Sequence, residues 1–121
     1  MRVLIVDDEP DVRLIAQLSL ANVGGMDVIE ASGGPEAIRL ATEHVPEVIL
    51  LDVSMPGMDG PATLAALRTD PRTAAIPVIF VTAHAMRSEI DELRALGARG
   101  VLTKPFDALG LPGLVKQMLD S

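Results

Sequence analysis

The stretch Glu47-Val48-Ile49-Leu50-Leu51-Asp52-Val53-Ser54-Met55-Pro56-Gly57-Met58-Asp59-Gly60 decides the fold of this chain. Its four consecutive apolar residues, 48–51, predict a strand that is buried on both faces of a sheet. Turn-forming residues follow at 56–60, and Pro61 is well placed as the first residue of a helix. Asp52 therefore lies at the carboxyl end of a buried strand, and this end is where open α/β sheets bind their ligands.

The composition is that of a globular domain of ordinary size. The 121 residues are 49% hydrophobic, which is enough to build a core without disulfides or a structural metal. No apolar run is as long as a membrane span, and no export signal, repeat or linker is visible, so we expect one cytoplasmic domain over residues 1–121. A net charge of −7 argues against nucleic acid or anionic membranes as partners and favours proteins.

The rest of the chain alternates strand and helix patterns. Apolar runs predict further strands at 3–6, 26–31, 77–82 and 101–103, and the more polar run at 26–31 suits an edge strand. Helices are expected from Pro10 to residues 22–24, from 33–35 to His44, from Pro61 through Leu67, from Ser88 to Gly97, and from Pro112 onward. Ser88 and Asp91 resemble a capping box. Five strands that alternate with five helices predict an α/β fold with a doubly wound parallel sheet.

Polar side chains stand at the ends of four of the five predicted strands. Asp7 and Asp8 follow the first strand, Asp52 ends the third, Thr82 ends the fourth, and Lys104 follows the fifth. Right-handed crossovers place the carboxyl ends of parallel strands on one edge of the sheet, so these side chains are expected to meet there.

Three carboxylates in one pocket repel each other, at a cost of roughly 3 kcal/mol for each ionised pair about 5 Å apart. A divalent cation would offset this repulsion, and a donor set made only of oxygen favours Mg²⁺ or Mn²⁺ over zinc. Lys104 would add a positive charge and Thr82 a hydroxyl. Around one carboxylate these groups form a cage for a phosphoryl group, in which Asp52 can act as the nucleophile.

The chain resembles the receiver domain of two-component response regulators over essentially its whole length. The resemblance rests on Asp7-Asp8, on Asp52 followed by Met55-Pro56-Gly57-Met58-Asp59-Gly60, on Thr82-Ala83 and on Lys104-Pro105-Phe106. It implies a flavodoxin-like, CheY-like fold with five helices and the strand order 2-1-3-4-5, an order known for this family.

The resemblance also implies a role for each residue of the pocket. Asp52 would accept a phosphoryl group from a phosphohistidine on a sensor histidine kinase or a histidine phosphotransfer protein. Asp8, Asp52 and the backbone carbonyl of Ser54 would bind Mg²⁺ directly, and Asp7 would act mainly through water. Lys104 would pair with the phosphate, and Thr82 would donate a hydrogen bond to it.

Further features of the family bear on its switch. The peptide bond before Pro105 is expected to be cis. Output to a downstream protein is expected over the fourth helix, the fifth strand and the fifth helix. The family uses an aromatic residue three positions before the lysine, where this chain has Val101, and its variable positions that set the phosphoryl lifetime correspond to Ser54 and His84.

Two other functions are weighed against this one. A Mg²⁺-dependent phosphohydrolase with an aspartyl nucleophile would carry a second Asp two residues after the first, where this chain has Ser54. A phosphorylation-independent docking domain would have no need of the intact pocket residues. We therefore expect a phosphoacceptor regulator and no enzyme beyond its own phosphorylation and dephosphorylation. A calcium loop starting at Asp52 is rejected because Thr63 stands where the bidentate Glu belongs.

Overall fold

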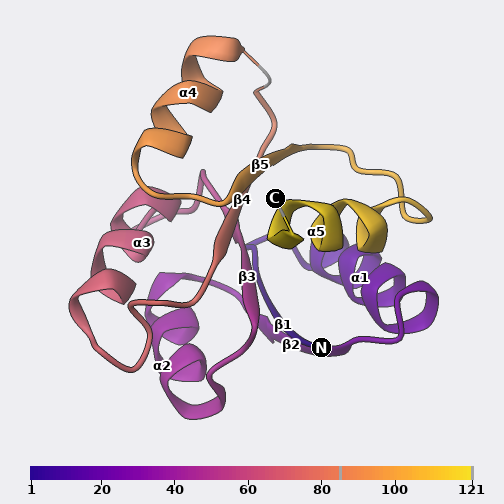
Figure 1. The fold of residues 1–121 in the computed structure, drawn as a ribbon, viewed down its shortest axis with the longest axis horizontal. Helices are drawn as coiled ribbons and strands as arrows, with labels where there is room; N and C mark the ends of the chain where they lie inside the picture. The colour runs from indigo at the N-terminus through magenta and orange to yellow at the C-terminus, as the bar shows by residue number, and fades with distance from the viewer. Residues whose placement is uncertain (85, 121) are drawn as a thin grey trace.

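The computed structural model describes residues 1–84 and 86–120, and these form a parallel sheet between two layers of helices (Figure 1). The strands are β1 (Arg2–Val6), β2 (Asp27–Ala31), β3 (Val48–Asp52), β4 (Val78–Thr82) and β5 (Gly100–Thr103). They lie in the order β2-β1-β3-β4-β5, and every neighbouring pair is parallel. The predicted fold class and strand order are confirmed.

The helices cover both faces of the sheet. One face carries α1 (Pro10–Leu18), the π-helical segment η1 that continues it (Ser19–Val23), and α5 (Leu111–Asp120). The other carries α2 (Gly34–His44), α3 (Gly60–Thr69) and α4 (Arg87–Ala95), as Figure 1 shows. Within the described part of the chain, no helix has both the length and the apolar character needed to cross a membrane.

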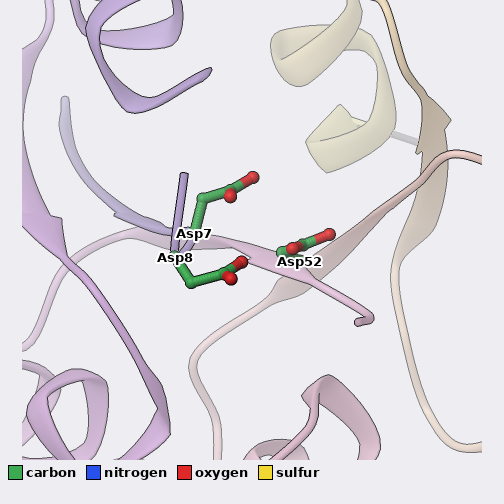
Figure 2. A group of neighbouring side chains, drawn as sticks. All are labelled: Asp7, Asp8 and Asp52. Carbon is green, nitrogen blue, oxygen red and sulfur yellow. The ribbon is translucent and has the colours of Figure 1, made fainter. Parts of the chain in front are cut away.

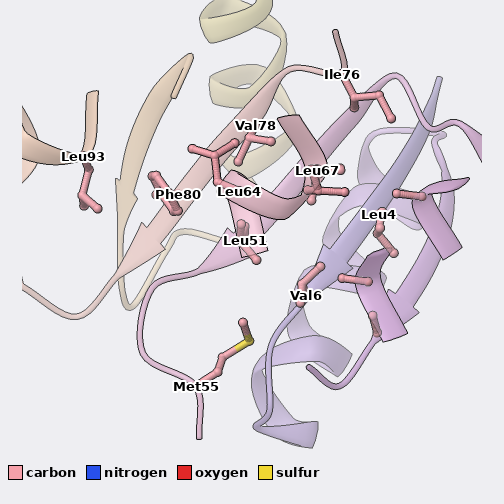
Figure 3. Close-up of a cluster of buried hydrophobic side chains, with 14 residues drawn as sticks. Leu4, Val6, Leu51, Met55, Leu64, Leu67, Ile76, Val78, Phe80 and Leu93 are labelled. Carbon is pink, nitrogen blue, oxygen red and sulfur yellow. The ribbon is translucent and has the colours of Figure 1, made fainter. Parts of the chain in front are cut away.

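Strand β3 lies at the centre of the core and is buried at every position. Successive side chains of a strand point to opposite faces, so Ile49 and Leu51 pack on the α2–α3 side, while Val48 and Leu50 pack on the α1–α5 side. Figure 3 shows the first of these clusters, in which Phe80 from β4 is fully buried. The run 48–51 is thus apolar because both of its faces are covered.

The turn after β3 is held by close contacts at the start of α3. Asp59 caps this helix, because its Oδ1 accepts a hydrogen bond of 2.8 Å from the N–H of Ala62. A Cβ atom on Gly60 would lie only 2.5 Å from the carbonyl oxygen of Asp52. Glycine at this position therefore lets α3 begin directly beside the end of β3, because no side chain stands between the start of the helix and the backbone of Asp52.

Helix α4 is anchored by one buried side chain, Leu93, and the apolar residues Met86 and Leu96 beside its two ends are exposed. The predicted capping box is wrong. The helix begins at Arg87, and its first turn is closed by a hydrogen bond from the N–H of Ile90 to the carbonyl of Met86. Ser88 therefore lies inside the first turn, where its side chain cannot act as the N-cap.

Helix α2 ends in an unusual backbone conformation. Val45 follows the helix with φ of 43° and ψ of 66°, which is the left-handed region, and its N–H donates to the carbonyl of Ala41. This region is unfavourable for a β-branched residue and is ordinarily taken by glycine. The strained residue lies at the amino edge of the sheet, beside Arg2, Asp27 and Glu47.

Candidate functional site

Three carboxylates meet at the carboxyl ends of β1 and β3 (Figure 2). Asp7 and Asp8 directly follow β1, and Asp52 is the last residue of β3. One carboxylate oxygen from each residue lies within 4.8 Å of the others. The parallel register pairs Val6 with Leu51, which brings the residues after them to the same height in the sheet. Asp7 and Asp52 are 2% and 3% exposed, so two of the three acids are buried.

Lys104 places its ammonium group between the two buried acids. Its Nζ lies 2.9 Å from Oδ2 of Asp7 and 3.1 Å from Oδ1 of Asp52. The backbone holds the lysine there, since its N–H donates a 2.8 Å hydrogen bond to the carbonyl of Thr82 at the end of β4. The Lys104–Pro105 peptide bond is cis, as expected.

The electrostatics of this group are unfavourable for the ionised form of Asp52. Burial raises the pKa of the Asp52 carboxyl, as do the charges of Asp7 and Asp8, and the hydrogen bond and charge of Lys104 offset this only in part. Burial by itself would lower the pKa of Lys104, but its hydrogen bonds to Asp7 and Asp52 leave that pKa raised. One lysine therefore does not compensate the three acids.

The donor chemistry of the pocket fits a hard divalent cation. Carboxylate oxygens from Asp7, Asp8 and Asp52 converge, and they carry more negative charge than Lys104 neutralises. Mg²⁺ and Mn²⁺ prefer such oxygen ligands, whereas zinc prefers nitrogen and sulfur. The expected acidic metal pocket is thus present as a cluster of side chains that could hold such an ion.

The remaining residues predicted for the site lie on its border. Thr82 is buried at the end of β4, and its hydroxyl accepts a 3.1 Å hydrogen bond from the N–H of His84. Ser54 is exposed in the segment that joins β3 to α3. Ser54, Thr82 and His84 line a cavity of about 310 Å³ that also reaches Leu93 of α4. The structure therefore connects the border of the acidic pocket to the weakly anchored helix.

Two residues near the pocket were not predicted to belong to the site. Glu9, which directly follows the acid pair, has its Oε1 3.9 Å from Nζ of Lys104. Arg13, in the second turn of α1, donates a 2.6 Å hydrogen bond to the backbone carbonyl of Asp7. Their position six residues or fewer from Asp7 is the only hint in the sequence, because the contacts depend on how α1 packs against the sheet.

Comparison with known proteins agrees with this geometry. A family model described as the response regulator receiver domain matches residues 3–116. The chain is 34% identical to the chemotaxis protein CheY of Pseudomonas aeruginosa over 120 residues, which covers 99% of this chain and 97% of that protein. The solved structure of the chemotaxis response regulator CheY4 of Vibrio cholerae has a TM-score of 0.89 and 31% identity, with 97% of both chains covered.

The chain therefore belongs to the response regulator receiver domain family and is a CheY-like domain of two-component signalling. Some relatives are much longer. Response regulator PleD of Caulobacter vibrioides is 40% identical over 118 residues, a match that covers 97% of this chain but 26% of PleD. The chain spans half of response regulator Rre1 of Synechocystis, at 36% identity. Receiver domains act as signalling regulators.

Proposed function

We propose that this domain is switched by phosphorylation of Asp52, with a phosphohistidine on a sensor histidine kinase or histidine phosphotransfer protein as the donor. The observation that carries the proposal is the placement of Lys104 between Asp7 and Asp52, with Asp8 beside them. This arrangement surrounds one strand-end carboxylate with the charges that phosphoryl transfer needs.

The transfer exchanges one bond to phosphorus for another. A carboxylate oxygen of Asp52 attacks the phosphorus, so an O–P bond forms while the N–P bond to the donor imidazole breaks. The imidazole nitrogen leaves with the electron pair and takes up a proton from water. Asp52 becomes an acyl phosphate. Lys104 then pairs with the new phosphoryl oxygens, and the hydroxyl of Thr82 turns from the N–H of His84 to donate to one of them.

Asp8, Asp52 and the backbone carbonyl of Ser54 would hold Mg²⁺ directly, and Asp7 would hold it through water. Mn²⁺ can take the same place, because its ligand preferences are similar. When bound, the ion supplies positive charge to the phosphoryl oxygens as negative charge builds up on them. The convergence of the three carboxylates and the raised pKa of Asp52 support this assignment.

The donor and the downstream target would use different surfaces. A cavity of about 360 Å³ opens beside Lys104, with walls from α1 and from the segment after β5. Ile15 lines this cavity, and Leu14 and Leu18 of the same helix are also exposed, so we assign this apolar surface of α1 to the donor. The downstream protein would bind over α4, β5 and α5, where Leu96 and Leu114 are exposed.

The proposal is tested by modification of the protein with a small acyl phosphate in the presence of Mg²⁺. We expect one phosphoryl group on the wild type and none on Asp52→Asn, read by mass spectrometry, with beryllofluoride binding following the same pattern. Equal modification of both proteins would exclude Asp52 as the acceptor. Repeated turnover of a phosphomonoester would instead identify a phosphohydrolase.

The metal is tested separately by thermal unfolding followed by circular dichroism. Millimolar Mg²⁺ should raise the melting temperature of the wild type more than that of Asp8→Ala, because a ligand that binds only the folded state stabilises it. The same shift in both proteins would place the ion elsewhere.

A further inference from the structure

Arg13 links three segments that border the acidic pocket. It lies in α1, its guanidinium donates a 2.6 Å hydrogen bond to the backbone carbonyl of Asp7, and its Nε lies 3.6 Å from Oε1 of Glu30 in β2. The side chain is 19% exposed, so most of it is packed against the protein. This long side chain thus reaches from the helix to the end of β1 and to the neighbouring strand.

The carbonyl that Arg13 holds belongs to the peptide unit between Asp7 and Asp8. The N–H of Asp7 donates to the carbonyl of Ala31 at 3.1 Å, and Oδ1 of Asp7 accepts from the N–H of Glu9 at 2.9 Å. The contact with Arg13 fixes the plane of the peptide that follows. The direction of the Cα–Cβ bond of Asp8 depends on this plane together with the φ of Asp8, so a change in the plane would move that carboxylate.

We infer that Arg13 is a positioning residue, which orients the Asp7–Asp8 peptide so that both carboxylates face Asp52 and a bound Mg²⁺. The inference rests on the proposed function, since the ion is part of it. Arg13 does not touch the reacting atoms and acts through the backbone carbonyl of Asp7. Outer groups that orient the ligands of a metal ordinarily change its affinity by about 10- to 100-fold when they are removed.

Because Arg13 is positively charged, the direction in which its replacement changes the Mg²⁺ affinity shows which role it has. A guanidinium near a cation site repels the ion, so removal of the charge alone would strengthen Mg²⁺ binding. Loss of an orienting hydrogen bond would weaken it. The two roles of Arg13 therefore predict opposite changes in the same measurement.

The experiment is a calorimetric titration of the unphosphorylated protein with Mg²⁺, comparing wild type, Arg13→Met, Glu30→Gln and Asp8→Ala. We expect Arg13→Met to bind Mg²⁺ about 10-fold more weakly than the wild type. Glu30→Gln removes the ion pair but leaves the Arg13–Asp7 hydrogen bond, so its affinity should stay near that of the wild type. Arg13→Lys keeps a side chain that can donate a hydrogen bond toward the carbonyl of Asp7, so it should recover part of the lost affinity although it also keeps the repulsive charge.

A second readout separates positioning from general damage. With a small acyl phosphate as donor, Arg13→Met should need about 10-fold more Mg²⁺ for half-maximal modification, but reach nearly the wild-type rate at saturating Mg²⁺. Circular dichroism in EDTA checks that the variant is folded. If Arg13→Met does not fold, Arg13→Gln, whose side chain is too short to reach the same carbonyl, is judged by the same criteria.

The outcomes distinguish the inference from the function on which it rests. Unchanged or tighter Mg²⁺ binding by Arg13→Met, beside a wild type that binds and an Asp8→Ala that does not, would overturn the positioning role alone. A wild type that does not bind Mg²⁺ would overturn the proposed metal site, and the inference with it. Weaker binding by Arg13→Met with Glu30→Gln unchanged supports the assignment.

Discussion

The two edges of the sheet both gather charged side chains, but they neutralise these charges in different ways. At the amino edge, Nε of Arg2 pairs with Oδ2 of Asp27 at 2.9 Å, and the two side chains are 45% and 63% exposed to water. At the carboxyl edge, one lysine serves two buried carboxylates, and a third acid lies beside them. At the amino edge, water solvates the paired charges. At the carboxyl edge, the acids outnumber the one lysine, which leaves an excess of negative charge.

Strain is present at both edges, and its kind differs. The amino edge has backbone strain at Val45, which no site residue requires. The carboxyl edge has electrostatic strain, visible in the raised pKa of Asp52, and a bound cation or an altered Asp52 would relieve it. Unfavourable electrostatics thus mark the edge where ligands are expected to act, and a strained turn alone does not.

Among the variants considered, Lys104→Met should cause the largest change in the free energy of unfolding. It is therefore the strongest test of the difference between the two edges. Removal of the ammonium leaves Asp7 and Asp52 buried without a counter-charge, and the loss of one member of a buried ion pair costs about 3–5 kcal/mol. The measurement is urea unfolding in EDTA, followed by circular dichroism. Arg2→Met at the amino edge is the matched variant and should cost no more than about 1 kcal/mol. Similar losses of stability in Lys104→Met and Arg2→Met would show that the charges at the two edges are not neutralised in different ways.

Asp52→Asn should change stability in the opposite direction. The pKa of Asp52 is raised by folding, so at pH 7 the ionised carboxylate destabilises the folded state. A neutral amide relieves this, and we expect the free energy of unfolding in EDTA to rise by about 1–3 kcal/mol. The gain should shrink as the pH falls through the folded pKa of Asp52, since the wild-type carboxyl is then protonated too. If Asp52→Asn were instead less stable than the wild type at pH 7, the ionised Asp52 carboxylate would not be destabilising the folded state.

Val45→Gly should stabilise the protein without affecting the pocket. Glycine adopts the left-handed conformation without the Cβ clash but loses more entropy on folding, which leaves a net gain of about 0.5–1 kcal/mol. Urea unfolding gives the stability, and the rate of modification by an acyl phosphate should not change. Gly97→Ala, at φ of 105° with open space around it, is the reverse test and should destabilise. A changed rate of modification in Val45→Gly would show that the backbone at the amino edge influences the acidic pocket at the carboxyl edge.

Asp27→Asn should have the smallest effect. The pair with Arg2 is exposed, so the loss of stability should not exceed about 1 kcal/mol and should vanish in about 1 M salt. The effect of Lys104→Met should persist in the same salt, because its carboxylate partners are shielded from solvent. Unfolding curves at low and high salt provide the check. A salt-resistant loss in Asp27→Asn would show that the amino edge is not solvated as described.

The apolar runs made the sheet predictable, and the resemblance supplied its strand order. The side chains at the strand ends could be placed together because parallel strands share one carboxyl edge. The start of α4 was missed, because a pattern such as Ser88 to Asp91 does not say which residue closes the first turn. Arg13 and Val45 were missed for a similar reason. A long side chain finds its partner, and a strained residue is tolerated, only through tertiary packing.

Leu93 is the buried side chain of α4, so the free energy needed to expose it is an estimate of the cost of moving this helix. To expose Leu93 costs roughly 2 kcal/mol, which lies within the 1–3 kcal/mol by which distant sites are ordinarily coupled. Under the proposed function, phosphorylation of Asp52 would need to supply only a free energy of this size to shift α4 between two positions. A small change in free energy would then be enough to move α4, and hydrolysis of the acyl phosphate would return the helix to its first position.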